Sequence, residues 1–136
     1  MILMKYSLDS SIKLMCLKSP DGPHSAEDTF RRLENHLSSM RKRKFYGLTR
    51  LEEGNLTYLA CVNMEGDADR DFVGGQKVTL EKGKYEREKI SDWKKNLGQI
   101  PAVIDRVAAE SSVDSERYVI EFYRSEKELF LMIPIK

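Results

Sequence analysis

The stretch RYVIEFYRSEKELFLMIPIK, residues 117–136, decides the fold. It holds two runs of apolar and aromatic residues separated by residues 125–127, a pattern typical of a β-hairpin. One acid, Glu121, lies in the middle of the first run. Strand alternation places Glu121 on the same face as Val119 and Tyr123, so we expect that face to be partly covered.

A strand and a helix precede this hairpin in the sequence. The alternation in residues 76–88, QKVTLEKGKYERE, predicts one strand that bends at Gly83. A helix is predicted from about Trp93, with Ser91 as its N-cap, because apolar residues recur at positions 100, 103, 104, 107 and 108. Pro101 has no N–H group, so this helix should kink or begin there.

The first part of the chain repeats the same order of elements. Residues 11–19, SIKLMCLKS, read as a strand. A helix follows, where Ser25 and Asp28 resemble a capping box. The helix has an apolar stripe along one face and ends in the basic run RKRK, residues 41–44, whose cations complement the helix dipole. The remaining members of this unit are the stripe residues Phe30, Leu33, Leu37 and Met40 and a hairpin made of strands starting at 45 and 56.

The order strand, helix, strand, strand therefore occurs twice. It predicts an α+β fold of tandem duplicated β-α-β-β units, with antiparallel sheets, one helix per half, a pseudo-twofold axis and a groove between the halves. We expect one domain over residues 1–136, with a first half at about 11–64, a linker at about 65–75 and a second half at about 76–136.

Composition excludes several classes of protein. With 40% apolar and 33% charged residues the chain is typical of a globular protein rather than a disordered one. No segment approaches the roughly 20 apolar residues that span a bilayer, and the first ten residues do not resemble a signal peptide, so we expect a cytoplasmic protein. The net charge of +1 predicts no direct nucleic-acid partner.

The cysteines and histidines predict no metal site. Cys16 and Cys61 lie far apart in the sequence, in strand-like runs. The geometry allows a disulfide between them, but buried free thiols are expected in a cytoplasmic chain. His24 and His36 do not have a spacing that binds zinc, and nothing in the sequence indicates a cofactor.

Glu121 has two interpretations that residue types alone leave open. A carboxylate beside apolar surface needs a cation or a raised pKa, and Arg117, on the same face by strand parity, or Arg124 could supply an ion pair. Alternatively, Glu121 is the charged floor of a ligand groove. Aromatic walls attract lipophilic cations there, and the candidate ligand-binding residues are Glu121, Tyr123, Trp93, Tyr58, Tyr85, Phe45 and Tyr46.

Residues 45–62, FYGLTRLEEGNLTYLACV, together with RYVIEFYR and LFLMIPIK, resemble the GyrI-like small-molecule-binding family. This family includes effector-binding domains of AraC-type and MerR-type multidrug regulators of bacteria. The resemblance covers nearly the whole chain and implies that Glu121 contacts bound cationic drugs. About ten residues precede the first predicted strand, so we expect a stand-alone member without a helix-turn-helix.

Three functions follow as expectations. The first is the binding of a hydrophobic, cationic or planar drug or toxin, with Glu121 as its polar anchor. The second is an enzyme, since the resemblance extends to hydrolases of cyclopropane-bearing toxins, with Glu121 as catalytic base and Tyr58, Tyr85 or Tyr123 as its tyrosine. The third is a gyrase-inhibitor-like role with a protein partner, for which the mixed-charge helix over residues 27–44 is the candidate surface.

Overall fold

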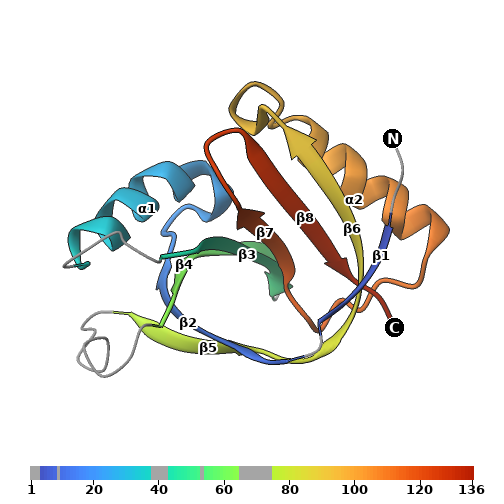
Figure 1. The fold of residues 1–136 in the computed structure, drawn as a ribbon, viewed down its shortest axis with the longest axis horizontal. Helices are drawn as coiled ribbons and strands as arrows, with labels where there is room; N and C mark the ends of the chain where they lie inside the picture. The colour runs from blue at the N-terminus through green and yellow to red at the C-terminus, as the bar shows by residue number, and fades with distance from the viewer. Residues whose placement is uncertain (1–3, 9, 38–42, 53, 65–74) are drawn as a thin grey trace.

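The computed structural model describes residues 4–8, 10–37, 43–52, 54–64 and 75–136. These residues form one curled antiparallel sheet of eight strands and two α-helices, which confirms the α+β class (Figure 1). The strand order is β1-β6-β8-β7-β3-β4-β2-β5. The strands are β1 (Met4–Leu8), β2 (Ile12–Lys18), β3 (Phe45–Glu52), β4 (Asn55–Asn63), β5 (Gln76–Leu80), β6 (Gly83–Ser91), β7 (Val119–Tyr123) and β8 (Glu128–Pro134).

Both predicted hairpins are confirmed, and they meet at the middle of the sheet. β3 pairs with β4, and β7 pairs with β8. The turn between β3 and β4 contains Gly54 at φ +80, a conformation that glycine adopts without steric cost. β3 also pairs with β7, with Gly47 opposite Glu121. The two hairpins therefore place Glu121 near the centre of the sheet.

The outer strands differ from the prediction. Residues 76–88 do not form one bent strand, because β5 ends at Leu80 and pairs with β2, whereas β6 starts at Gly83 and pairs with β8. β1 was not predicted, and it pairs with β6. Each edge strand thus joins the strand that begins the other half of the chain, which residue alternation cannot reveal.

The two helices lie on the outer side of the curled sheet (Figure 1). α1 (Ala26–Asn35) packs on β2 and β4, and α2 (Gln99–Glu110) packs on β6 and β8. The predicted first helix was too long: α1 ends at Asn35, and residues 38–42, with Met40 and half of the basic cluster, lie outside the described residues. On the exposed side of α1, Arg31 and Glu27 form an ion pair at 3.0 Å.

The structure confirms where the first predicted helix starts, without the expected cap hydrogen bond, and corrects the start of the second. Ser25 precedes α1 but makes no cap hydrogen bond, since its hydroxyl contacts that of Ser19 at 2.5 Å. Ser91 ends β6, and the segment after it forms the 3₁₀ turn η3 (Trp93–Lys95) before α2 begins. Pro101 lies in the first turn of α2, where its missing N–H costs no helical bond.

Three apolar clusters hold the fold together. Two lie beneath the helices and include Leu33 with α1 and Val107 with α2. The third fills the inner side of the curl, where Leu8 and Leu80 come together from the two edge strands. Among the described helices, none is both long and apolar enough to cross a membrane.

The prediction of free thiols was wrong. Cys16 and Cys61 lie directly opposite each other on β2 and β4, with Cα atoms 4.1 Å apart, and form a disulfide. Both are fully buried in the inner cluster. Their pairing depends on the register of β2 against β4, which the spacing of the two cysteines along the chain does not reveal.

Candidate functional site

Two tyrosine hydroxyls converge on one oxygen of Glu121. Tyr58 donates to Oε1 at 2.7 Å and Tyr123 donates to the same atom at 2.5 Å. The two hydroxyl oxygens are 3.1 Å apart. Each hydroxyl has one proton to donate. When both hydroxyls donate to Oε1, neither donates a hydrogen bond to the other. The three groups form a compact cluster, which we call the carboxylate–tyrosine cluster.

The cluster depends on a glycine in the strand between its members. Tyr58 lies on β4 and Glu121 on β7, and β3 separates these strands. A Cβ added at Gly47 of β3 would overlap the Tyr58 hydroxyl and would lie 2.6 Å from Glu121 Oε1. Real Cβ atoms do not make such contacts, so the glycine leaves the space in which the hydroxyl and the carboxylate meet.

Burial controls the ionisation of the cluster. Glu121 is 7% exposed, and loss of hydration raises the pKa of its carboxyl, while the hydrogen bonds from Tyr123 and Tyr58 act in the opposite direction. Burial also raises the pKa of both tyrosine hydroxyls, and the nearby Glu121 carboxylate adds to this effect. The hydroxyls therefore remain protonated and act as donors.

The second carboxylate oxygen of Glu121 has a different environment. Oε2 accepts no hydrogen bond from the described residues, whereas Oε1 accepts two. A buried carboxylate is stabilised by partners, and an unused acceptor on it favours a further donor or a positive charge. Oε2 thus offers an acceptor position for a cationic or hydrogen-bonding group.

Aromatic rings surround the cluster and connect the two helix-covered clusters. Phe30 of α1 meets the ring of Tyr123 edge-on at 5.5 Å and that of Tyr58 at 6.3 Å. Trp93 of η3 lies in the same half of the chain as Tyr123, and the centroids of the two rings are 4.9 Å apart. Phe45 contacts Phe30 at 6.4 Å. The Trp93 indole donates to the carbonyl of Ser125, which fixes its ring.

Of the predicted ligand-binding residues, the structure brings five to this face of the sheet: Glu121, Tyr123, Tyr58, Trp93 and Phe45. Tyr46 and Tyr85 lie on the opposite face, in the inner cluster. Tyr46 follows Phe45 in β3, so the two side chains must point to opposite faces. Phe30 was predicted only as part of the apolar stripe of a helix, and the residue pattern gave no signal for its contact with Tyr123.

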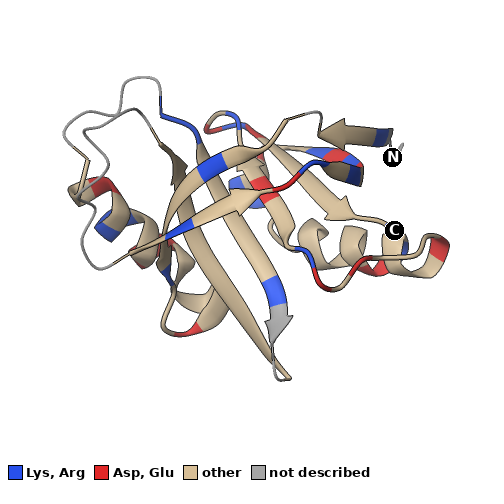
Figure 2. Cartoon of the chain, turned by 90° about the horizontal axis from the view of Figure 1, so that it is seen from below, with Lys and Arg blue, Asp and Glu red and all other residues tan. Residues whose placement is uncertain are grey.

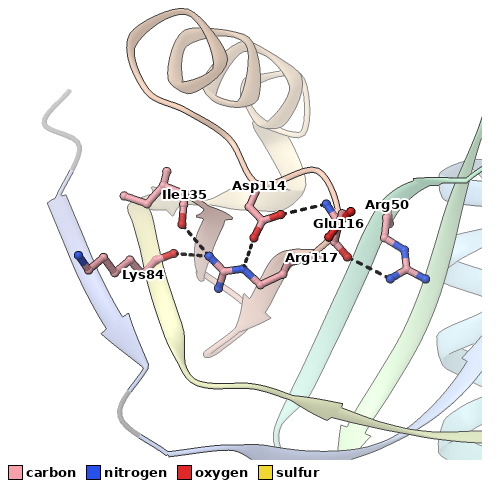
Figure 3. Close-up of polar contacts among 6 residues, drawn as sticks. All are labelled: Arg50, Lys84, Asp114, Glu116, Arg117 and Ile135. Atoms are coloured by element: carbon pink, nitrogen blue, oxygen red, sulfur yellow. Dashed lines mark hydrogen bonds and ion pairs between the residues drawn. The ribbon is translucent and has the colours of Figure 1, made fainter.

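Among the residues that the structure describes, no arginine holds Glu121. Its hydrogen bonds come from the two tyrosines, and Arg117 instead contacts Asp114 at 3.0 Å and the carbonyl oxygens of Lys84 and Ile135 (Figure 3). β7 begins at Val119, so strand alternation does not extend back to Arg117. Among the described residues, no group of three or more His, Cys, Asp or Glu side chains is placed to hold a metal ion.

No family model and no curated protein matches the sequence. Solved structures do match the fold. An integron cassette protein from the mobile metagenome of Vibrio cholerae is 13% identical, with a TM-score of 0.74 over 98% of this chain and 95% of that one. SAV2435 bound to tetraphenylphosphonium is 18% identical, with a TM-score of 0.70 over 100% and 94%. A putative transcription regulation protein from Staphylococcus aureus is 17% identical, with a TM-score of 0.63 over 100% and 99%.

Proposed function

We propose that this protein binds hydrophobic organic cations on the helix-covered face of its sheet, with Glu121 as the anionic anchor. The observation that carries the proposal is a carboxylate that is 93% buried, is not neutralised by an arginine or lysine among the described residues and is surrounded by aromatic rings. An organic cation supplies the missing positive charge, and the rings supply cation–π attraction of about 0.5–2 kcal/mol each.

The strand order supports a groove between two halves as the place of binding. Reading the order from either end gives an edge strand, the first strand of one unit, and then that unit's hairpin. We therefore infer that β2-α1-β3-β4 and β6-α2-β7-β8 are structural repeats related by a twofold axis between β3 and β7. Phe30 comes from the first unit and Trp93 from the second, and both contact Tyr123 at the junction.

The fold relatives are consistent with this proposal. One of them, SAV2435, has the cation tetraphenylphosphonium bound, and another is described as a putative transcription regulation protein. These likenesses support membership of the GyrI-like, effector-binding type of fold. For this chain, a small-molecule effector is the partner that we propose.

Hydrolysis by the same residues is a second candidate. Burial raises the pKa of Glu121, so its carboxylate is a stronger base than an exposed one, and the tyrosine hydroxyls could orient a strained electrophile. In this scheme Glu121 takes a proton from water while the water oxygen bonds to a cyclopropane carbon. A ring C–C bond breaks, its electron pair passes into the conjugated system of the alkylator, and the opened product takes up the proton from Glu121, which restores the carboxylate. Mass spectrometry of a cyclopropane-bearing alkylator incubated with the protein tests it, because only turnover adds the mass of water to the compound.

Calorimetric titration tests the binding proposal directly. Tetraphenylphosphonium should bind to the protein with saturation, and triphenylphosphine oxide, which has similar rings without a net charge, should bind more weakly. Equal affinity for both compounds would contradict the role of Glu121 as an anionic anchor, and no binding of either would contradict the proposed function.

A further inference from the structure

The two carboxylate oxygens of Glu121 differ in how they are held. The hydroxyls of Tyr58 and Tyr123 both donate to Oε1, and these two bonds fix the direction of the carboxylate. Oε2 accepts no hydrogen bond from the described residues, and it is not among the polar atoms that are sealed from solvent without a partner. The small exposed part of Glu121 therefore includes Oε2, which is a fixed acceptor that a ligand can reach.

The sheet positions around Glu121 supply no further side-chain donor to Oε2. On the helix-covered face, the neighbours of Glu121 are Gly47 on β3, Leu131 on β8, and Val119 and Tyr123 on β7 itself. Of these side chains, that of Tyr123 has a proton to donate, and Oε1 receives it. The indole of Trp93, which packs on Tyr123, donates to the carbonyl of Ser125. These contacts leave the donation to Oε2 to the ligand.

The strands around Glu121 also carry little positive charge. β4, β7 and β8 have no lysine or arginine in their sequences, and Figure 2 shows long uncharged stretches in the strands of the sheet. Arg50 of β3 lies over the ring of Tyr118 at 4.2 Å, and Arg106 of α2 pairs with Glu88 at 3.0 Å. A positive charge at Oε2 is therefore a charge that the ligand brings.

An ammonium group of the chain itself lies on one of the rings beside the carboxylate–tyrosine cluster. Lys94 Nζ is 5.6 Å from the centre of the Trp93 ring, and Trp93 packs edge-on against Tyr123. Lys94 is exposed, whereas Phe30, Phe45 and Trp93 are partly exposed, so solvent reaches these rings. An alkylammonium ion is thus compatible with this aromatic surface.

We propose that the preferred ligands of this site are protonated amines, whose N–H group donates to Oε2 of Glu121 while their apolar part contacts Phe30 and Trp93. This inference rests on the proposed binding of organic cations and adds the chemical class of the cation. A charge-assisted hydrogen bond is roughly twice as strong as a neutral one. A phosphonium or quaternary ammonium ion has no such proton, so it binds through charge and rings alone and leaves Oε2 without a donor.

The aromatic rings alone favour the opposite order of affinity. Aromatic sites recognise quaternary ammonium ions by cation–π attraction, which needs no proton. An added methyl group also buries more apolar surface than a proton does. A preference for the protonated amine therefore reports the hydrogen bond to Oε2 and not the rings.

Calorimetric titration at pH 7 with a matched pair of cations tests the proposal. Dimethyl(diphenylethyl)amine, which is protonated at this pH, and trimethyl(diphenylethyl)ammonium have the same rings and the same charge. The protonated amine should bind the wild type about tenfold more tightly. In Glu121→Gln, whose amide oxygen is uncharged, this ratio should fall to about threefold or less. Glu128→Gln, the same substitution on the inner face, should keep the wild-type ratio.

The outcomes separate this inference from the proposed function. Equal affinity for the two cations, tighter binding of the quaternary one, or an unchanged ratio in Glu121→Gln would overturn the preference for N–H donors. Tetraphenylphosphonium has no N–H group, so its binding reports the proposed function alone. If it binds while the wild type does not favour the amine, the function stands and this inference fails; if no cation binds, both fail. The wild-type ratio decides the matter even where Glu121→Gln does not fold.

Discussion

Tyr123 donates a hydrogen bond to Glu121 from two residues along the same strand, at 2.5 Å. Residues i and i+2 of a strand share a face, so the chain itself brings this donor to the acid. Tyr58 comes from another strand and needs Gly47 to reach the same oxygen. The cluster therefore combines a local contact with one that only the folded sheet creates.

Removing either hydroxyl should raise the pKa of Glu121 further, because both hydrogen bonds stabilise its ionised form. Cation affinity needs the carboxylate, so it should fall as pH decreases through the pKa of Glu121. In Tyr58→Phe and Tyr123→Phe this fall should occur at higher pH than in the wild type. Titrations of tetraphenylphosphonium over a pH series measure the midpoint, and Tyr46→Phe, on the opposite face, should leave it unchanged.

Glu121 should also make stability depend on pH. Its folded pKa is raised above the unfolded value, so the folded state holds the proton more tightly. The resulting stabilisation is complete below the unfolded pKa and is lost as pH rises through the folded pKa. Glu121→Gln lacks this loss and should unfold at a higher temperature than the wild type at pH 7, with the difference shrinking toward acidic pH in thermal scans. A variant less stable than the wild type at pH 7 would contradict this.

Gly47→Ala should disrupt the carboxylate–tyrosine cluster. Its new Cβ would collide with the Tyr58 hydroxyl and Glu121 Oε1, and such overpacking costs about 1–3 kcal/mol of the free energy of unfolding. Gly98→Ala is the control, because a Cβ there meets nothing within 4 Å, and it should change stability by less than about 0.5 kcal/mol. Urea unfolding measures both, and equal stability of the two variants would count against the packing at Gly47.

The disulfide should stabilise the fold. Reduction of a native disulfide typically lowers the free energy of unfolding by about 2–4 kcal/mol. Thiol labelling in denaturant should detect no free thiol before reduction and both cysteines after it, since Cys16 and Cys61 are paired. Labelling of both cysteines without reductant would show that the pair is not bonded in the protein.

Much of the fold could be predicted from residue patterns. The β7–β8 hairpin, which contains Glu121, and the β3–β4 hairpin, which turns at Gly54, have apolar strands with clear turn residues between them. The helix α2 has a regular apolar stripe. β1 gave little signal because it is five residues long and lies at the edge of the sheet. The break between β5 and β6 depends on which partner each segment finds, and this is a tertiary property.

The candidate site was predictable in its centre and less so in its surroundings. Glu121 and Tyr123 follow from strand alternation, and Tyr58 was among the aromatic candidates. Counting aromatic residues ignores the face on which each one lies, and Tyr46 and Tyr85 lie on the face opposite Glu121. The stack of Tyr46, Phe122 and Phe130 joins β3 to the β7–β8 hairpin, which is distant in sequence, so only the sheet order reveals it.

The most direct test of the central claim is the affinity of Glu121→Gln for tetraphenylphosphonium, followed through the fluorescence of Trp93, the single tryptophan, which packs on Tyr123. Loss of a buried charge pair should weaken binding at least about tenfold, while triphenylphosphine oxide binding changes little. Glu128→Gln removes a charge from the opposite face and should have no effect. An equal loss for the cation and the neutral compound, or no loss for either, would contradict the role of Glu121 as the anionic anchor.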